Sequence, residues 1–336
     1  MPEHNQSLVS VYEFEAQAQK FLPKQAYDYY RSGADDEVTL NRNINAFKNI
    51  VIRPRMLRNV SVRDLSISIF GDKLKSPLAI APTASQCMAH PEGEKATSRA
   101  GAATGTLMMA STIATTSLED ISSAAPGGVR WFQLYVYKDR EESKRLVKRA
   151  EAAGYKALVL TVDTPVSGKR RDDVRNGFSL PSHLRMANFD IKQSKSSAMQ
   201  TEISGSSGFS EYVKKLFDPT LSWNDVSWLT KVSNIPVLVK GILTAEDAIL
   251  ARDYGASGVI VSNHGARQLD SSPATIEALP EIANVLKGSN CHVFMDGGVR
   301  TGNDVLKALA LGAELVFVGR PVLWGLAVKV TLYRSV

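Results

Sequence analysis

Eight short apolar runs, separated by longer amphipathic segments, constrain the fold of this chain more than any other feature. The runs have the length and apolar content of buried strands and lie at Pro77–Ala81, Gly105–Ser111, Val129–Tyr137, Ala157–Asp163, Pro236–Lys240, Gly258–Asn263, Cys291–Asp296 and Leu315–Gly319. Most intervals hold a helix-like pattern, as in Glu92–Ala103, Asp139–Ala153, Ala245–Tyr254, Ala274–Lys287 and Gly302–Leu311. Strands that alternate with helices form right-handed parallel crossovers, and eight such units predict a closed (β/α)8 barrel.

This pattern leaves one alternative fold, a doubly wound open sheet with helices on both faces. No Gly-x-Gly-x-x-Gly follows the first predicted strand, and its absence disfavours that sheet. Before residue 70 the pattern is helical, over Val11–Leu22 and again around Tyr27–Tyr30. We therefore predict an N-terminal helical extension over residues 1–70 and a TIM-type barrel over 71–336, together one domain of about 8–336.

The charge of the chain limits its partners. It carries 40 Lys and Arg against 34 Asp and Glu, a formal net charge of +6, and the basic residues are spread along the chain. This distribution argues against nucleic acid and suits an anionic substrate or phosphate cofactor, or simply a mildly basic surface. No stretch approaches about 18 apolar residues and the N-terminus is polar, so we expect no membrane span and a soluble intracellular protein.

The interval from Pro181 to Gly208 breaks the strand–helix rhythm. It is rich in serine, and such a composition does not build a core. Because it follows the fourth predicted strand, on the side where such barrels carry their sites, one interpretation is a mobile lid over residues 181–208. A tolerated insertion without a role is the other interpretation.

Polar side chains or glycines follow the predicted strands, whose carboxyl ends form the face that carries active sites in such barrels. On the last two strands the pattern is Gly298 with Arg300 and Gly319 with Arg320. Glycines permit close backbone approach and arginines supply charge-assisted donors. Glycines after one strand often only make a turn, but two such pairs on adjacent strands favour a phosphate site.

The sixth predicted strand leads into the polar segment Ser262–Gln268. Within it, His264 can accept a proton near neutral pH and the Arg267 guanidinium suits a carboxylate. Asp163, after the fourth strand, is placed to orient His264, or instead caps the following turn. Lys240, after the fifth strand, would place a cation in the barrel mouth, where it could stabilise negative charge on a bound ring. Together these residues predict a site that activates a small carboxylic acid, with a structural histidine and solvated basic side chains as the alternative.

With these residues assembled, the chain resembles the FMN-dependent 2-hydroxy-acid oxidase and dehydrogenase family, from about Val11 to Ala327. The segments that carry the resemblance, in the family's order, are Tyr27–Tyr30, Ala81–Ala84, Gln133–Tyr135, Thr161–Pro165, Leu238–Gly241, Ser262–Gln268, Asp296–Arg300 and Gly319–Pro321. The resemblance implies a (β/α)8 barrel with FMN as its cofactor and a small 2-hydroxy acid and O2 as its partners. No metal is expected.

The resemblance also implies a role for each matched residue. His264 resembles the active-site base, oriented by Asp163, and Tyr135 matches a phenol near the substrate hydroxyl. The implied substrate-binding residues are Tyr29, Tyr135, Arg170 and Arg267, the two arginines holding the carboxylate. The implied FMN contacts are Thr83, Ala84, Ser111, Gln133, Thr161, Lys240 and Ser262 around the ring, and Asp296, Gly298, Arg300, Gly319 and Arg320 around the ribityl chain and phosphate.

The implied reaction oxidises an (S)-2-hydroxy acid, glycolate-like or longer, to a 2-oxo acid, and O2 becomes hydrogen peroxide. A non-oxygen electron acceptor stays open, as does the choice between proton and hydride removal from carbon. An inactive barrel that acts only as an assembly partner, and a phosphate-binding barrel without FMN, also fit parts of the pattern. By resemblance we expect a homo-oligomer, a tetramer in the family, in the peroxisome or otherwise the cytoplasm. The last three residues, Arg334-Ser335-Val336, are not a peroxisomal tripeptide.

Two departures from the family pattern carry predictions. Ile113 stands where glycolate-oxidising members usually have tryptophan, and the smaller side chain predicts a wider pocket that accepts longer substrates. After Trp324–Ala327 the family continues into a long final helix, whereas this sequence stops at Val336. We therefore expect the eighth barrel helix to be largely missing and the outer face of strands eight and one to be uncovered.

Overall fold

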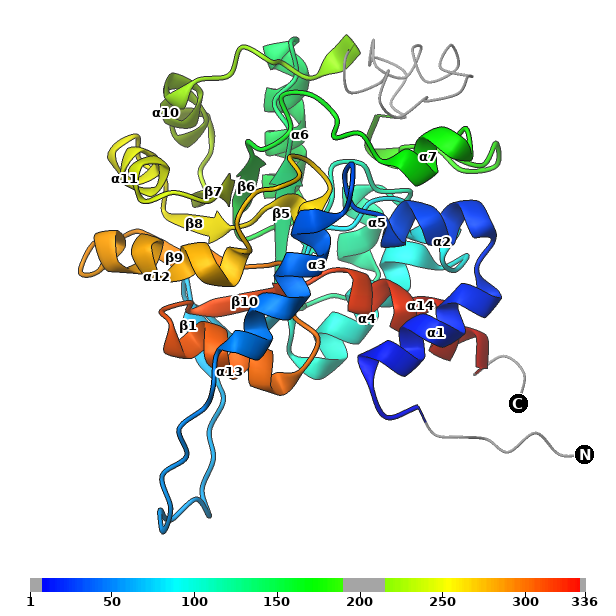
Figure 1. The fold of residues 1–336 in the computed structure, drawn as a ribbon. Helices are drawn as coiled ribbons and strands as arrows, with labels where there is room; N and C mark the ends of the chain where they lie inside the picture. Colours follow the sequence, from blue (N-terminus) through cyan, green and yellow to red (C-terminus); the bar gives the residue numbers. More distant parts are fainter. Residues whose placement is uncertain (1–7, 190–214, 333–336) are drawn as a thin grey trace, which may run out of the picture.

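The computed structural model describes residues 8–189 and 215–332 (Figure 1). Its centre is a closed barrel of eight parallel strands in the spatial order β10-β3-β4-β5-β6-β7-β8-β9. The strands are β3 (Leu78–Ile80), β4 (Leu107–Ala110), β5 (Arg130–Leu134), β6 (Leu158–Thr161), β7 (Val237–Ile242), β8 (Gly258–Val261), β9 (His292–Met295) and β10 (Leu315–Val318). The predicted barrel is confirmed, and the open-sheet alternative is wrong.

Inward-facing side chains fill the lower part of the barrel, because alternate residues of a strand point to the same face. The Trp131 ring lies at the centre of this inner cluster, 5.5 Å from the Phe294 ring and 5.8 Å from the Phe317 ring. An antiparallel hairpin of β1 (Ile67–Ile69) and β2 (Asp72–Leu74) packs on the same cluster. The predicted boundary after residue 70 falls at the turn of this hairpin.

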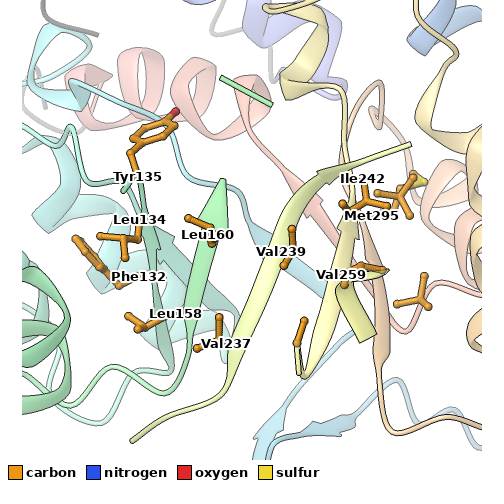
Figure 2. Close-up of a cluster of buried hydrophobic side chains, with 14 of the residues drawn as sticks. Phe132, Leu134, Tyr135, Leu158, Leu160, Val237, Val239, Ile242, Val259 and Met295 are labelled. Carbon is orange, nitrogen blue, oxygen red and sulfur yellow. The ribbon is translucent and has the colours of Figure 1, made fainter. Parts of the chain in front are cut away.

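A second, larger core lies between the strands and the surrounding helices. Figure 2 shows part of it, the outward-facing residues of neighbouring strands, among them Phe132, Leu134, Leu158, Leu160, Val237, Val239, Val259 and Met295. These strands are thus buried on both faces. Burial on both faces explains why they are continuous apolar runs in the sequence rather than alternating ones.

Helices follow most strands, as the strand–helix rhythm predicts, and most of these helices cover the barrel. They are α4 (Gly93–Thr104), α5 (Leu118–Ser123), α6 (Arg140–Ala152), α7 (Arg171–Arg175), α10 (Trp223–Val232), α11 (Ala245–Asp253), α12 (Thr275–Leu286), α13 (Gly302–Ala310) and α14 (Arg320–Leu332). Before the barrel come α1 (Val11–Phe21), α2 (Lys24–Arg31) and α3 (Val38–Asn45). Short 3-10 turns lie at Ala46–Asn49, Gln86–Met88, Ala187–Phe189 and His264–Ala266.

The carboxyl-terminal region differs from the expectation. Helix α14 follows β10 directly and packs against α1, so that Trp324 is fully buried with its ring 5.5 Å from that of Tyr27 (Figure 1). The outer face of the first and last barrel strands is covered too, since Val316 is 0% exposed and Ile80 is 7% exposed. The prediction of an uncovered face is therefore wrong. The expectation that the long helix after Trp324–Ala327 is largely missing is not contradicted, because α14 itself contains these residues. The N-terminal helices supply the apolar partner that the local sequence does not reveal.

Two smaller differences concern strand and loop boundaries. Strand β7 continues through Ile242 instead of ending at Lys240, with an irregularity of its pairing with β8 at Gly241 (φ +112°). The proposed lid over residues 181–208 lies outside the described residues from position 190 onward. In the part of the chain that the structure describes, no helix is long and apolar enough to cross a bilayer.

Candidate active site

A cavity of about 1100 Å³, counted with its open mouth, lies at the carboxyl end of the barrel. Along each strand, the inward-facing positions change from apolar to polar at this level. Phe294 in the inner cluster is followed two residues later by Asp296, and Leu238 is followed two residues later by Lys240. Because side chains repeat every second residue along a strand, both polar groups face the barrel axis. The same strands thus build an apolar interior below and a polar site above.

The structure brings the predicted site residues together around this cavity. Those that line it are Tyr29, Thr83, Ala84, Ser111, Gln133, Tyr135, Thr161, Arg170, Lys240, His264, Arg267, Asp296, Gly298, Arg300, Gly319 and Arg320. The other two predicted residues lie one layer behind. Asp163 contacts His264, and the Ser262 hydroxyl accepts a hydrogen bond from Lys240. Asp163 and Ser262 therefore contact residues that line the cavity and do not line it themselves.

His264 and Asp163 form a hydrogen-bonded pair in the cavity wall. His264 Nδ1 lies 2.7 Å from Asp163 Oδ1, although 101 residues separate the two in the chain. Because a carboxylate only accepts, we assign the imidazole proton to Nδ1, which leaves Nε2 as the acceptor. Burial lowers the pKa of His264, and the attraction of Asp163 offsets this only in part. The imidazole is therefore neutral near pH 7 and able to take a proton at Nε2.

Asp163 itself stays ionised. Burial alone raises the pKa of its carboxyl, but the neighbouring His264 and Lys240 outweigh burial and hold that pKa below its usual value. The Thr164 hydroxyl also donates to Asp163 Oδ1 at 3.0 Å, so Asp163 makes both the contact with His264 and the local turn contact that the sequence left open. An ionised Asp163 can stabilise an imidazolium that forms on His264.

The backbone turns sharply after β8, and this turn sets the direction of His264. The φ angle is +58° at His264 and +62° at Ala266, a conformation that is costly for residues with a Cβ. The side-chain oxygen of Asn263 stabilises the turn by accepting from the Ala266 amide at 3.1 Å. Asn263 also exchanges two buried hydrogen bonds, at 2.9 and 2.8 Å, with Asn43 of α3. No sequence signal marks Asn43 for this role, because it lies 220 residues away.

Two guanidiniums enter the cavity wall from different loops, Arg170 after β6 and Arg267 after β8. Arg170 Nε donates to Asp173 at 2.7 Å. Arg267 Nη1 donates to the Tyr29 carbonyl at 2.6 Å, and its guanidinium lies 4.9 Å from the Tyr29 ring centroid. Burial and the nearby charge of Arg170 lower the pKa of Arg267 to about 10. A carboxylate bound between the two arginines would relieve this repulsion.

Two tyrosines complete this wall, and each is held by an aromatic residue that no sequence motif indicates. The Tyr29 ring stacks on Phe178 at 4.3 Å, and the Tyr135 ring stacks on Phe217 at 4.3 Å. Burial and the Asp163 charge raise the pKa of Tyr135 well above its usual value. Its phenol therefore keeps its proton and is a hydrogen-bond donor at physiological pH.

Polar groups on neighbouring strands form the floor of the cavity. Lys240 Nζ donates to Ser262 Oγ at 2.9 Å and lies 3.4 Å from Asp296 Oδ2. Gln133 Nε2 donates to Thr161 Oγ1 at 3.1 Å. Asp296 Oδ1 is buried and has no hydrogen-bond partner among the described residues. A buried carboxylate oxygen left in this way is suited to accept from a hydroxyl of a bound molecule.

The two predicted Gly/Arg pairs lie together at one end of the cavity. Arg320 donates to the carbonyls of Tyr30, Ser32 and Gly265 at 2.8, 3.0 and 3.0 Å, which ties α2 to the loop after β8. Burial and the neighbouring guanidiniums of Arg267 and Arg300 lower the pKa of Arg320 to about 9. Arg300 Nε is buried without a partner among the residues that the structure describes. This end of the cavity is prepared for an anion.

Gly298 and Gly319 have different surroundings. At Gly298 (φ +77°) a Cβ would lie 2.1 Å from the Asn43 carbonyl oxygen, so the close approach there is to α3 of the protein itself. At Gly319 a Cβ would meet only Thr83 Cγ2 at an ordinary 3.4 Å and Ala81 Cβ at 3.8 Å. The space in front of Gly319 therefore belongs to the cavity, and a ligand is free to approach its backbone.

The similarity of this chain to known proteins agrees with this geometry. A model of the FMN-dependent dehydrogenase family matches residues 18–331. The chain belongs to the FMN-dependent dehydrogenase family. The chain is 53% identical over 320 residues to 2-hydroxyacid oxidase 1 of Mus musculus, covering 95% of this chain and 86% of the relative. It is 53% identical over 323 residues to glycolate oxidase of Spinacia oleracea, covering 96% and 86%.

Among solved structures, mandelate oxidase in complex with (S)-4-hydroxymandelic acid matches with a TM-score of 0.89 and 42% sequence identity, covering 95% of this chain and 88% of that one. As a member of the FMN-dependent dehydrogenase family, the chain is an FMN-dependent oxidoreductase that acts on 2-hydroxy acids. The prediction of FMN as cofactor is confirmed.

The residues present fit FMN. The cluster of Arg300 and Arg320 matches the charge of a phosphate, and the unpartnered oxygen of Asp296 suits a ribityl hydroxyl. Lys240, Gln133 and the other polar groups of the cavity floor offer donors to the edge of a heteroaromatic ring.

Proposed function

We propose that this chain oxidises (S)-2-hydroxy acids to 2-oxo acids and transfers the electrons to O2, forming hydrogen peroxide. The observation that carries the proposal is that one cavity wall holds both a neutral base, His264 paired with Asp163, and two guanidiniums, Arg170 and Arg267. In a 2-hydroxy acid the reacting carbon is bonded to the carboxylate, so the base and the carboxylate-binding groups must lie close together. The (S)-4-hydroxymandelic acid bound to mandelate oxidase supports the (S) enantiomer.

In this proposal each residue has one task. Arg170, Arg267 and Tyr29 bind the substrate carboxylate, and the protonated Tyr135 phenol donates to the substrate hydroxyl oxygen. His264 Nε2 accepts one proton, and the Asp163 carboxylate stabilises the resulting imidazolium. Bound FMN supplies the two-electron acceptor, and O2 then takes two electrons and two protons to become hydrogen peroxide. His264 acts as base whether it takes the proton from carbon or from the hydroxyl.

The FMN contacts follow from the layers of the cavity. We propose that the ring contacts are Thr83, Ala84, Ser111, Gln133, Thr161 and Lys240, with Ser262 acting through Lys240, and that the ribityl and phosphate contacts are Asp296, Gly298, Arg300, Gly319 and Arg320. Lys240 would lie near the part of the ring that becomes negative on reduction. Its cation would stabilise that charge, and its contacts with Ser262 and Asp296 hold it in place.

The side chain of Ile113 bears on substrate length. Ile113 lines the cavity and is 2% exposed, and its carbonyl accepts from the Ser85 amide at 3.2 Å. An aliphatic side chain occupies less of the cavity than the indole that the family resemblance implies at this position in glycolate-oxidising members. We propose that the chain accepts side chains longer than that of glycolate.

The experiment is to load the purified protein with FMN and supply (S)- and (R)-2-hydroxy acids in air. We expect (S)-substrates to yield one hydrogen peroxide per 2-oxo acid and (R)-substrates to yield far less. If 2-oxo acid forms only with an artificial electron acceptor and no peroxide appears, the protein is a dehydrogenase. If the flavin is not bleached anaerobically by any 2-hydroxy acid, the protein is inactive and the proposal fails.

We also propose that the chain forms a homo-oligomer. Residues 50–66 form an arm that extends away from the barrel (Figure 1), and it exposes large apolar side chains, among them Val51, Met56, Leu57, Val60 and Val62. Exposed apolar surface of this extent is typical of an interface. Light scattering should give a multiple of 36.6 kDa, and Leu57→Asp with Val62→Asp should lower it, whereas Val9→Asp should not. A monomeric wild-type protein would contradict the proposal.

The peroxisomal location expected from the resemblance stays a proposal. A fluorescent fusion at the N-terminus, observed together with a peroxisomal marker, tests it directly. A diffuse signal would favour the cytoplasm instead.

A further inference from the structure

Gln268, the last residue of the segment after β8, uses both ends of its side-chain amide on the loop after β6. Its Nε2 donates to the carbonyls of Asp163 and Val166, each at 2.9 Å. Its Oε1 accepts from the Gly168 amide at 3.1 Å. One side chain thus binds the backbone of the neighbouring loop at its start, in its middle and near its end.

Gly168 shows how close the two loops are. A Cβ at Gly168 would lie 2.2 Å from the Arg267 carbonyl oxygen and 2.7 Å from Gln268 Cα. The backbone of one loop therefore lies directly against the backbone of the other, which only glycine permits. The Gln268 hydrogen bonds and the Gly168 contact fix the same separation from two sides.

Each functional pair of the proposed site has one member on each of these two loops. Asp163 and Arg170 belong to the loop after β6, at either end of the stretch that Gln268 binds, while His264 and Arg267 belong to the loop after β8. The two arginines repel each other: burial is the larger cause of the lowered pKa of Arg267, and the charge of Arg170 lowers it further. The loops therefore need an attractive contact that keeps them together when no carboxylate is bound.

We propose that Gln268 is a positioning residue that holds Asp163 against His264 and Arg170 beside Arg267. Gln268 lines the cavity, but in this role it acts through the backbone of the neighbouring loop. The inference rests on the proposed function for its catalytic consequence, but the positional claim concerns the loops alone. Its failure and the failure of the proposed function are therefore distinguishable.

The positional claim is tested by ¹⁵N NMR of the histidine side chains in the FMN-loaded protein. The chain has five histidines, and His264→Asn assigns the resonance of His264. In the wild type, the contact with Asp163 should hold neutral His264 in the Nδ1–H tautomer. In Gln268→Met, which keeps the length of the side chain but has no amide, we expect the Nε2–H tautomer to appear. An unchanged tautomer in Gln268→Met would overturn the inference.

The catalytic consequence is tested by steady-state kinetics on the same proteins. In Gln268→Met we expect kcat to fall at least about 10-fold and KM for the 2-hydroxy acid to rise by a similar factor, because both pairs are displaced. The affinity for FMN should stay within about 3-fold, since most of the proposed cofactor contacts, and all of those around the phosphate, follow other strands. Val166→Ala is the matched control, because it alters the exposed side chain of the same loop and keeps the carbonyl that Gln268 binds.

The outcomes separate the two claims. If wild type oxidises no 2-hydroxy acid but the tautomer still depends on Gln268, the proposed function fails and the positioning inference stands. If the wild type is active and Gln268→Met keeps its tautomer, kcat and KM, the inference fails. Should Gln268→Met not fold, Gln268→Glu keeps the acceptor for Gly168 and loses the two donors, and the same tautomer shift is expected of it.

Discussion

Gly241 of β7 packs directly against the side chain of Asp163, so that a Cβ at Gly241 would lie 2.7 Å from Asp163 Cβ and 2.9 Å from its Cγ. Gly241 also has φ +112°, at the irregularity between β7 and β8. The absence of a side chain at Gly241 thus makes room for the residue that orients His264. The irregularity after Lys240 therefore leaves the space that Asp163 needs to contact His264.

We predict that Gly241→Ala displaces Asp163 and lowers kcat at least about 10-fold, because the hydrogen bond to His264 is lost or lengthened. Stability should also fall by about 1 kcal/mol or more, because alanine is strained at this φ. Gly154→Ala is the matched control, since Gly154 has φ +80° but nothing within 4 Å of its Cβ position. That control should lose stability and keep kcat. Equal kcat in both variants would show that Gly241 does not position Asp163.

The pH dependence of the reaction should report His264. Its pKa is lowered from 6.5, chiefly by burial, so the imidazole stays neutral down to pH values below 6.5 and kcat/KM should fall only beneath that value. The Asp163 charge raises this pKa, so Asp163→Asn should move the acidic limb to still lower pH while the maximal rate falls about 10²–10⁴-fold. Rate profiles from about pH 4.5 to 9 test both statements, a range that brackets the usual histidine pKa. A wild-type limb above pH 6.5 would contradict them.

Ile113 should control which substrates are accepted. Ile113→Trp fills part of the cavity, so we expect kcat/KM to fall about 10-fold or more for hydroxy acids with four or more carbons and to change little for glycolate. Ile113→Val, which removes one methylene, should leave the order of substrates unchanged. The measurement is kcat/KM of each protein for 2-hydroxy acids of increasing chain length, and the ratio of the longer substrates to glycolate is compared between proteins. Strict preference for glycolate in the wild type would refute the wider pocket.

Arg300 should bind the phosphate of FMN. Its Nε has no partner among the described residues, and its Nη1 donates only to the adjacent Val299 carbonyl at 3.0 Å among the hydrogen bonds described. Arg300→Met should therefore weaken FMN by about 1.5–3 kcal/mol, or roughly 10- to 150-fold. Riboflavin, which has no phosphate, provides the control ligand and should bind both proteins equally. A similar loss for both ligands would place Arg300 away from the phosphate.

Removal of FMN should destabilise the protein, because the ligand binds only the folded state. At a free concentration about 100 times its Kd, FMN contributes about 2.7 kcal/mol. Part of the apoprotein's instability should come from repulsion among Arg267, Arg300 and Arg320, which together with burial lowers the pKa of Arg320 to about 9. We expect inorganic phosphate to raise the Tm of the apoprotein more than chloride at equal ionic strength does. No difference between the two salts would indicate that these arginines do not form an anion site.

Much of the fold was predictable because its signals are local. The eight strands are continuous apolar runs, and their order along the chain is also their order around the barrel. The site residues were found because parallel strands end on one face, so that Lys240, Ser262 and Asp296 had to meet there. The covering of the last part of the barrel was not predictable, because α14 packs against α1, from the opposite end of the chain.

The sequence by itself determined which chemical groups would stand at the barrel mouth, since the period of two along each strand decides which residues face inward. Only the tertiary structure decided which of those groups touch. Asp163 reaches His264 across 101 residues, Asn43 reaches Asn263 across 220, and Gln268 binds a loop that begins 105 residues earlier. Such contacts depend on distances of a few ångströms between segments that are independent in the sequence, and folding of the whole barrel is what brings them together.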